Sequence, residues 1–526
     1  LTDRVKRAVV DAFAPDALLA ALDSVIDKDA TPDIVPAGAM VLQPSEERRR
    51  SGSHYTPREL TEPIVRETLD PVLQRLRDDQ QRSPTPERIL DLKVCDPAMG
   101  SGAFLVEACR QLGDALVESW HAHDVLPDIP SDENETVFAR RQVARRCLYG
   151  VDRNPAAVDL AKLSLWLVTL AKDHPLTFLD HALRQGDSLV GLGRQQIDGF
   201  HWKEGGLQEG MEAVKAAEHL KSVARLRRRI READDNVSGR ELRDLWDAAK
   251  YESAQVALLG DLVLASFFDG SKPKEREDRR RHYAGEVLNE HAHRYLGWLE
   301  ELRDADPPLA PFHWQIEFPE VFDRGNPGFD AIIGNPPFAG KNTVAAANRP
   351  GYTDWLKQMN AESHGNADLV AHFFRRAFDL IRAGGAFGLI ATNTIAQGDT
   401  RSTGLRWICE NGGEIYRAKR RLKWPGLAAV VVSVLHVWKG RFGGAKRLDE
   451  FDVDRITAFL FHRGGHSDPQ RLEENAGKSF QGSIVLGMGF TFDDTDKKGV
   501  ATPIAEMQRL IEENPRNQVI FPVRWW

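Results

Sequence analysis

Short apolar runs alternate with longer segments of helical spacing through much of the chain, and most runs end in a polar residue, glycine or proline. Such runs predict buried strands, because they are too short for helices and rich in β-branched residues. We expect strands at residues 89–96, 147–152, 183–187, 329–334, 386–392 and 427–438. Strand and helix alternate from 89 to 440, which predicts an α/β fold with a parallel sheet and helices on both faces.

A long charged stretch interrupts this alternation between the third and fourth expected strands. Helical spacing recurs within residues 196–318, at 209–232, 240–252 and 282–304. Charges of both signs are mixed there, which is typical of solvated helices. The pattern therefore predicts a helical insertion.

The expected strand at 329–334 leads directly into Asn335-Pro336-Pro337-Phe338. The two prolines stop a strand or a helix from continuing, and each fixes its own φ. In open α/β sheets, ligands bind just past the carboxyl ends of the strands. We therefore expect a rigid turn that presents a side-chain amide and an aromatic ring to a ligand.

A glycine-rich turn follows the first expected strand. The strand ends at Asp96, and Pro97-Ala98-Met99-Gly100-Ser101-Gly102 leads into an apolar helix containing Phe104. Glycines let the backbone approach a ligand, and a helix start offers free N–H groups. A dinucleotide site would show G-x-G-x-x-G and bind a pyrophosphate, whereas Asp96 would repel phosphate and suits an ammonium. The turn indicates a cationic, amino-acid-like cofactor such as S-adenosylmethionine (AdoMet), which carries an ammonium and a sulfonium.

Two more acids end the next two expected strands. Asp152 stands where an acid can accept both ribose hydroxyls in a doubly wound sheet. Asp187 can accept the exocyclic amine of the cofactor adenine. Each acid alone is more often a cap or turn residue, but three at successive strand ends favour a single ligand site.

A helix start precedes the first strand. Thr56 is expected to cap a helix that has Pro57 at its first position and Glu59 in its first turn. Tyr55 and Thr56 are displayed at this start and can also contact a ligand.

The 526 residues carry a net charge of -8, and 42% of them are hydrophobic. This length predicts several domains. No uninterrupted run of about 18 apolar residues is present, so we expect no membrane contact, and residues 1–4 show no signal-peptide pattern. The four cysteines are widely spaced, which favours the reduced thiols of a cytoplasmic protein over disulfides or a zinc site. We expect no metal.

Positive charge is concentrated late in the chain. Residues 401–447 contain eleven Lys and Arg against two acids. Such an excess is a candidate phosphate-binding surface, although a solvated face is the commoner explanation.

Taken together, these motifs resemble the gamma-class amino-methyltransferases of DNA. The resemblance rests on His54-Tyr55-Thr56-Pro57, the Asp96–Gly102 turn, Asp152, Asp187 and Asn335-Pro336-Pro337-Phe338 in this order. It covers residues 50–195 and 319–440. The insertion is similar to that of single-chain restriction–modification enzymes and of BREX- and DISARM-type phage-defence methylases, and the stretch 424–430 resembles the defence branch.

The resemblance implies a doubly wound, Rossmann-like AdoMet-dependent sheet and transfer of a methyl group to N6 of an adenine flipped out of duplex DNA, with other defence subunits as possible partners. It implies a catalytic turn at Asn335, Pro336, Pro337 and Phe338. The target base would stack on Phe338 and on Trp424, where the family often has Phe; a core role for Trp424 is an equal alternative. The implied cofactor-binding residues are Tyr55, Thr56, Pro57, Asp96, Pro97, Ala98, Gly100, Ser101, Gly102, Phe104, Asp152, Arg153, Asp187 and Ser188.

The implied organisation has five parts. They are an N-terminal helical segment (1–45), the cofactor-binding half of the methyltransferase domain (46–195), the insertion (196–318), the catalytic half (319–440) and the start of a target recognition domain (441–526), which we expect to be incomplete.

Two alternatives remain open. The same turn serves other planar amines: cytosine N4, RNA guanine N2 or a protein glutamine. The chain can instead be a subunit that senses DNA or AdoMet without turnover. Methylation of cytosine C5 is disfavoured, because it needs a nucleophilic cysteine beside a proline and none of the four cysteines has this setting.

Overall fold

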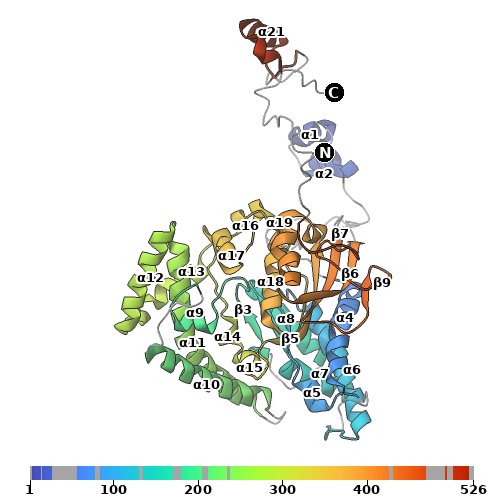
Figure 1. Cartoon of the computed structure of the whole chain (residues 1–526), viewed down its shortest axis with the longest axis vertical. Helices are drawn as coiled ribbons and strands as arrows, with labels where there is room; N and C mark the ends of the chain where they lie inside the picture. Colours follow the sequence, from blue (N-terminus) through green and yellow to red (C-terminus); the bar gives the residue numbers. More distant parts are fainter. Residues whose placement is uncertain are drawn as a thin grey trace. The chain divides into compact units, whose positions relative to one another are not determined.

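The computed structural model describes residues 3–12, 15–25, 56–77, 83–129, 134–169, 179–203, 211–233, 237–425, 431–468, 492–494 and 501–519. Two compact units are present, Leu1–His466 and Ser467–Trp526 (Figure 1). The second contains α21 (Ile504–Glu513) and the 3-10 helix η8 (Pro515–Val519), and the first begins with α1 (Asp3–Val10), α2 (Pro15–Leu22) and η1 (Asp23–Val25). Within the described ranges, no helix is both long and apolar enough to cross a membrane.

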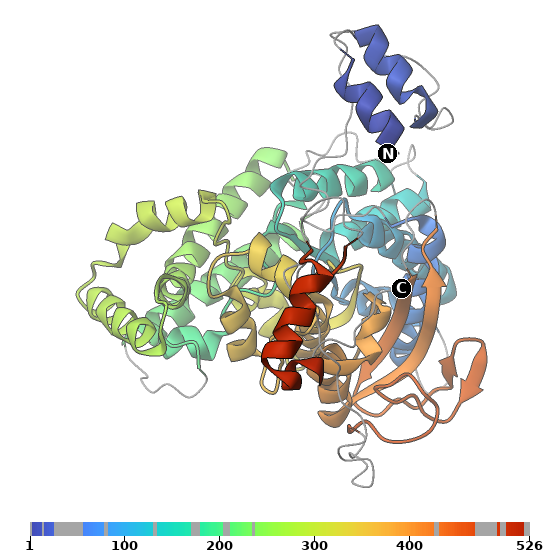
Figure 2. The ribbon, with the colours of Figure 1, turned by 90° about the horizontal axis from the view of Figure 1, so that it is seen from above.

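A nine-stranded mixed sheet forms the centre of the larger unit, in the order β3-β2-β1-β4-β5-β7-β6-β8-β9 (Figures 1 and 2). The strands are β1 (Val94–Asp96), β2 (Leu148–Asp152), β3 (Leu183–Gln185), β4 (Phe329–Gly334), β5 (Ile381–Thr392), β6 (Gly413–Lys423), β7 (Val431–Lys439), β8 (Lys446–Leu448) and β9 (Phe451–Val453). Strands β1 to β5 pair with one another in parallel, as expected. The expectation of a parallel sheet is wrong beyond β5, because β7 runs antiparallel to both β5 and β6.

Helices cover both faces of the sheet, so the residues of one strand are divided between two cores. In β4, Ala331 and Ile333 join a first core, and Phe329 and Ile332 join a second. Burial on both sides explains why β4 reads as a continuous apolar run. The first core contains α4 (Arg58–Leu76), α5 (Pro86–Leu90), α6 (Ala103–His123), α7 (Glu135–Arg146) and α8 (Pro155–Thr169). The second contains α14 (Trp314–Glu317), α15 (Pro319–Phe322), α18 (Leu369–Leu380), η4 (Asn393–Ala396), η5 (Ser402–Arg406) and α20 (Trp407–Glu410).

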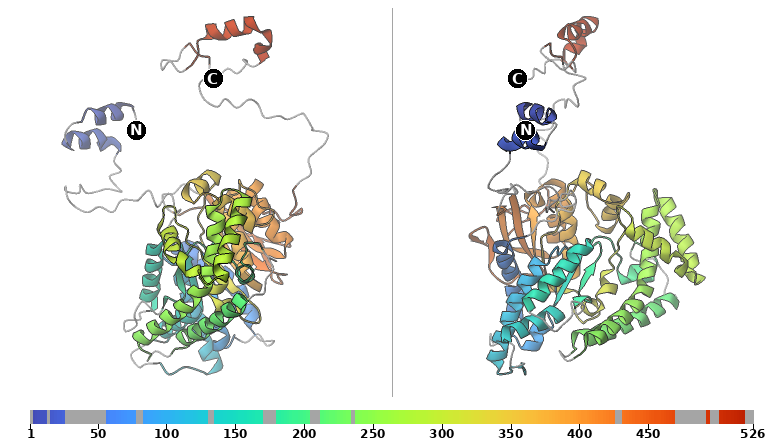
Figure 3. Two further views of the ribbon diagram at one scale, coloured as in Figure 1. Left: turned by 90° about the vertical axis from the view of Figure 1, so that its left-hand side faces the viewer. Right: turned by 180° about the vertical axis from the view of Figure 1, so that it is seen from behind.

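The expected helical insertion lies between β3 and β4. Its helices are α9 (Arg194–Asp198), α10 (Met211–Arg231), α11 (Gly239–Asp269), α12 (Pro273–Leu288), η3 (Ala292–Tyr295) and α13 (Leu296–Asp304), followed by α14 and α15. Figure 3 shows the green helices of this insertion gathered beside the sheet. A buried ion pair between Arg227 of α10 and Glu320 of α15 fastens them to the second core.

Several local expectations need correction. Ile89 and Leu90 belong to α5, so the first strand starts only at Val94. Strand β5 starts at Ile381, before the expected residue 386, and contains Gly384 and Gly385 where its pairing with β4 shifts register. Strand β6 was not expected, and residues 427–430 of the last expected strand lie outside the described residues. The sheet also continues past residue 440 through β8 and β9.

Candidate active site

The centre of the site lies where β1 and β4 end side by side. These strands pair in parallel, with Cys95 opposite Ile332, so the segments that follow them leave the sheet at the same edge. A Cβ built on Gly334 would lie 2.6 Å from Oδ1 of Asp96, and real Cβ atoms do not approach other atoms that closely. Glycine at position 334 therefore lets the Asn-Pro-Pro turn lie directly against the carboxyl group of Asp96.

Asn335 is held by one end of its amide. Its Nδ2 donates a hydrogen bond to Oγ1 of Thr56 at 3.3 Å. Its Oδ1 is buried and has no hydrogen-bond partner among the residues described. Leaving a buried acceptor unpaired costs about 1–3 kcal/mol, so an oxygen of this kind is a candidate contact for a ligand N–H.

Thr56 does not cap the helix, contrary to the expectation from sequence. Helix α4 begins at Arg58 with Pro57 as its N-cap residue, and no side chain bonds to its first N–H groups. Thr56 is buried, and its hydroxyl is directed at Asn335, which is 279 residues away in the chain. The expected contact between Tyr55 and a ligand lies outside the described residues.

Asp96 has one oxygen to offer. Its Oδ1 accepts the backbone N–H of Ala98 at 3.0 Å, and its Oδ2 is buried without a partner in the described part of the chain. Burial raises the pKa of Asp96 to about 8, with a smaller contribution in the same direction from the charge of Asp152. Because a cation next to this group would favour its charged form, the arrangement suits an ammonium.

Asp152 holds the glycine-rich turn in place. Its Oδ2 accepts the N–H of Gly100 at 2.9 Å, and its Oδ1 accepts the N–H of Asn154 at 2.8 Å. Burial raises the pKa of this carboxyl group. Gly102 has φ +84° and is the N-cap residue of α6, where a Cβ would lie 3.1 Å from Cβ of Ala161. The turn therefore needs glycine both for its backbone conformation and for its packing on α8.

Asp187 is hydrogen-bonded to a tyrosine that belongs to no motif in the sequence. The hydroxyl of Tyr352, from α17 (Tyr352–Met359), lies 3.2 and 3.1 Å from the two carboxyl oxygens of Asp187. Oδ1 also accepts the N–H of Leu189 at 3.0 Å, and Nη1 of Arg153 lies 3.9 Å from Oδ2. The same Nη1 donates to Oδ1 of Asn348 at 2.5 Å. The segment after the Asn-Pro-Pro turn thus contacts two of the expected cofactor-binding residues.

The remaining expected residues are divided between the site and the core. Ser188 donates to the carbonyl of Pro97 at 2.5 Å and so ties the end of β3 to the end of β1. Phe104 is part of the first core. Ala98, Ser101 and Pro337 are half-buried around the two turns, and Pro336 is buried.

Phe338 and Trp424 are both half-buried at the same edge of the sheet. Phe338 packs against both cores, and Trp424 packs against the first. Lys423 pairs with Val431 at the end of the β6–β7 hairpin, which places Trp424 past that end. The expected second aromatic contact therefore lies three strands away from β4, at the correct edge.

A second unexpected residue holds the end of the Asn-Pro-Pro turn. Oδ1 of Asp368 accepts the N–H of Ala339 at 3.2 Å and also caps α18 by accepting the N–H of Val370 at 3.0 Å. The carbonyl of Ala339 accepts the N–H of Leu369 at 2.9 Å. A capping Asp before an apolar helix is visible in sequence, but its second contact is not.

Most members of the basic run at 401–447 have acidic or carbonyl partners within the chain, and the phosphate-binding surface stays a prediction. Arg401 is buried and stacks on Phe459. Lys439 donates to the carbonyls of Phe378 and Ile381. The remaining ion pairs are Arg406–Glu362, Arg417–Glu67, Lys419–Glu450, Arg420–Asp449, Lys446–Glu414 and Arg447–Glu450.

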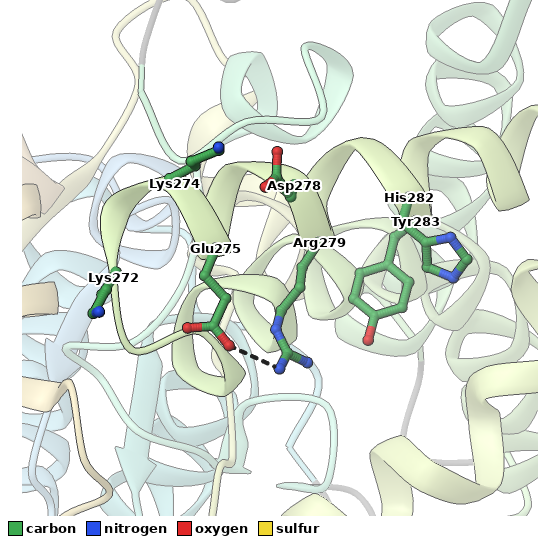
Figure 4. A pocket seen from close by; sticks show the side chains of 7 residues that line it. All are labelled: Lys272, Lys274, Glu275, Asp278, Arg279, His282 and Tyr283. Atoms are coloured by element: carbon green, nitrogen blue, oxygen red, sulfur yellow. Dashed lines mark hydrogen bonds and ion pairs between the residues drawn. The ribbon is translucent and has the colours of Figure 1, made fainter.

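A wide surface hollow of about 510 Å³ lies elsewhere, along α12 and the residue before it (Figure 4). It is lined by Lys272, Lys274, Glu275, Asp278, Arg279, His282 and Tyr283. Glu275 pairs with Arg279 across it at 3.2 Å. None of its lining residues belongs to the site at the ends of β1 and β4.

The doubly wound sheet and the acids at its strand ends define an AdoMet-dependent methyltransferase fold. Residues 146–411 match the family model described as Eco57I restriction-modification methylase, and residues 74–185 match the DNA-methyltransferase domain of MmeI. The chain therefore belongs to the Eco57I restriction-modification methylase family.

Related proteins are longer than this chain. A protein of Methanocaldococcus jannaschii, named as a type II restriction enzyme and methyltransferase, is 21% identical over 68% of this chain and 33% of its own length. The Escherichia coli type II restriction enzyme and methyltransferase RM.Eco57I is 29% identical over 30% of this chain and 16% of its own length. The solved type IIL restriction-modification enzyme MmeI in complex with DNA aligns with a TM-score of 0.44 at 15% identity, over 96% of this chain and 51% of that one. The chain thus spans a third of the first curated relative.

Proposed function

We propose that this chain transfers the methyl group of AdoMet to N6 of an adenine that is flipped out of duplex DNA, and that the modification marks host DNA in a restriction or phage-defence system. The observation that carries the proposal is Oδ1 of Asn335, a buried acceptor with no partner in the described chain, on the residue that follows the glycine packed against Asp96. Membership of the restriction-modification methylase family supports DNA as the substrate.

The chemistry follows from the turn. An exocyclic amine is a poor nucleophile, because its lone pair is delocalised into the ring. Oδ1 of Asn335 and the carbonyl of Pro336 would accept the two hydrogens of this amine, which shifts the nitrogen towards sp³ and directs its lone pair. Placing donor and acceptor in line then supplies much of the rate. No covalent intermediate on the enzyme is needed.

The target base must leave the duplex, which costs a few kcal/mol. A ring that stacks on the extruded base contributes about 1–3 kcal/mol. We assign this contact to Phe338, which the Ala339–Asp368 bond holds at the end of the turn, and to Trp424 at the same edge.

The residues present fit AdoMet, which supplies an electrophilic methyl group when bound. Oδ2 of Asp96 would accept its ammonium, since this oxygen is buried and has no partner within the described ranges. Asp152 would accept the ribose hydroxyls, and Asp187 the amine of its adenine. The remaining contacts would come from the backbone of the 97–102 turn and the first N–H groups of α6.

The test is to incubate the protein with methyl-labelled AdoMet and DNA that lacks modified bases, to digest the DNA to nucleosides and to identify them by mass spectrometry. We expect the label in N6-methyldeoxyadenosine. Label in N4-methyldeoxycytidine would assign the same turn to cytosine, and no label in DNA would overturn the proposal. The Asn335→Ala variant is the control: it should still bind S-adenosylhomocysteine, the demethylated product, but transfer no methyl group.

A further inference from the structure

The hydroxyl of Thr56 can donate a hydrogen bond as well as accept one, and only its acceptor role is used within the described residues. It accepts a hydrogen bond from Nδ2 of Asn335, and no residue in the described part of the chain accepts its own proton. Thr56 is 4% exposed, and helix α4 does not use it as a cap. A buried O–H donor without an acceptor is as incomplete as the unpartnered acceptor oxygens of Asn335 and Asp96.

This unused proton matters for the orientation of the amide. A hydroxyl both donates and accepts, so by itself Thr56 can bond to either end of the Asn335 side chain. Only one orientation of the amide is useful. When Nδ2 bonds to Thr56, Oδ1 is left to accept a hydrogen from the target amine. In the reverse orientation, Nδ2 would face the amine, and two donors would meet. If a third group takes the Thr56 proton, Thr56 can only accept, and the useful orientation becomes obligatory.

We propose that Thr56 is a positioning residue that orients the Asn335 amide, and that it does so when the carboxylate of the bound cofactor accepts its hydroxyl proton. An amino-acid end carries its ammonium and its carboxylate on one carbon. If the ammonium binds Asp96, the carboxylate would be within one carbon of it, and the Thr56 hydroxyl would be a donor for that carboxylate. Thr56 bonds to Asn335, which follows the glycine packed on Asp96. This inference rests on the proposed function.

The consequence is a coupling between two ligands. Cofactor binding would prepare Asn335 for the target amine, so DNA would bind more tightly to the cofactor-bound protein. The part of the cofactor responsible would be its amino-acid end. Allosteric couplings are typically about fivefold or more.

The experiment measures the affinity for a duplex that contains the methylated sequence, with and without ligand. S-adenosylhomocysteine carries the carboxylate, and 5′-methylthioadenosine lacks the whole amino-acid end. We expect the first to tighten DNA binding about fivefold or more and the second to have little effect. Thr56→Val should abolish the coupling, and Thr56→Ser should keep it. Equal coupling by both ligands, or full coupling in Thr56→Val, would overturn the proposal.

A kinetic comparison separates positioning from a simple cofactor contact. Thr56→Val should lower kcat at saturating AdoMet by about tenfold or more, as loss of an oriented polar group does. In the Asn335→Asp variant both side-chain oxygens are acceptors, so Thr56→Val added there should change kcat much less. A Thr56→Val effect confined to the KM for AdoMet would contradict the proposal. If Thr56→Val does not fold, Thr56→Ala replaces it in both experiments.

The two proposals fail in different ways. If no base is methylated by the wild-type protein, the proposed function fails. If methylation is normal but Thr56→Val behaves as wild type, only the role of Thr56 fails.

Discussion

Gly334 and Asp96 meet at the carboxyl edge of the sheet, where a methyl group on residue 334 would lie 2.6 Å from Oδ1 of the carboxyl group. The contact joins β4, which carries the Asn-Pro-Pro turn, to β1, which carries the glycine-rich turn. The proposed acceptor half and the proposed cofactor half of the site therefore meet at one close approach.

Gly334→Ala should displace Asp96 without unfolding the protein. Overpacking of this kind costs about 1–3 kcal/mol, so we expect the affinity for S-adenosylhomocysteine to fall about tenfold or more. Isothermal titration calorimetry measures it directly. Gly340→Ala is the matched control, because a Cβ there meets nothing within 4 Å. Unchanged affinity in Gly334→Ala would contradict the close approach.

Cofactor binding should release a proton at neutral pH. Burial raises the pKa of Asp96 to about 8, so below pH 8 the free protein holds this carboxyl group mostly protonated. A bound ammonium favours the carboxylate, which lowers its pKa and expels the proton. Affinity for S-adenosylhomocysteine should therefore rise as the pH rises from about 6 to 7.5, where an α-amino group is still largely protonated.

Calorimetry in two buffers of different ionisation enthalpy measures the number of protons released when the ligand binds. Asp96→Asn has no proton to lose, so its binding should be weaker and independent of pH across this range. Binding by the wild-type protein without proton release at pH 7 would show that Asp96 does not receive the ammonium.

The hydroxyl of Tyr352 donates a hydrogen bond to the carboxyl group of Asp187. We expect the amine of the cofactor adenine to bind the same carboxyl group. Tyr352→Phe frees the carboxylate, and one hydrogen bond is worth about 0.5–1.5 kcal/mol. We expect two- to tenfold tighter binding of S-adenosylhomocysteine, roughly as that energy implies. The affinity for S-inosylhomocysteine, which has an oxygen in place of the amine, should not increase in Tyr352→Phe. An equal change for both ligands would mean that Asp187 does not recognise the adenine.

The buried ion pair of Arg227 and Glu320 should hold the insertion on the sheet. Burial alone would raise the pKa of Glu320, but the charge and hydrogen bonds of Arg227 outweigh it and lower the pKa to about 2. The two Arg227–Glu320 hydrogen bonds measure 2.8 and 2.7 Å, and Arg227 also donates to the carbonyl of His181. Breaking a buried pair by removing one partner costs about 3–5 kcal/mol.

Glu320→Gln should therefore lower the free energy of unfolding of the larger unit and speed proteolysis within the insertion. The exposed pair Arg228–Glu232 on the same helix is the control. Surface pairs contribute about 0–1 kcal/mol, so Glu232→Gln should have little effect. Similar stability of the two variants would mean that the buried pair does not fasten the insertion.

The parts of the fold that sequence predicts are those with local signals. Strand β4 is an apolar run ended by proline, and the 96–102 turn combines an acid with two glycines that adopt positive φ. Strand β6 was not predicted, because Arg417, Lys419 and Arg420 interrupt its apolar pattern. Ile415 and Ala418 of this strand are nevertheless buried.

The parts that sequence does not predict depend on residues far apart in the chain. Thr56 reads as a helix cap, and only the fold brings it to Asn335. The basic run reads as an open surface, but its partners, such as Glu67 and Glu362, come from other segments. Tyr352 belongs to no motif, and its contact with Asp187 follows from the packing of α17 on the segment after β3, around Leu189.

The central claim is that Asn335 accepts the hydrogens of a target amine on DNA. Single-molecule sequencing of DNA from cells that express the wild-type protein or Asn335→Ala tests it directly, because the method reports the modified base and its sequence together. We expect N6-methyladenine at one recurring sequence with the wild-type protein and none with the variant. Unmodified DNA in the wild-type cells, or the same methylation with Asn335→Ala, would contradict the account.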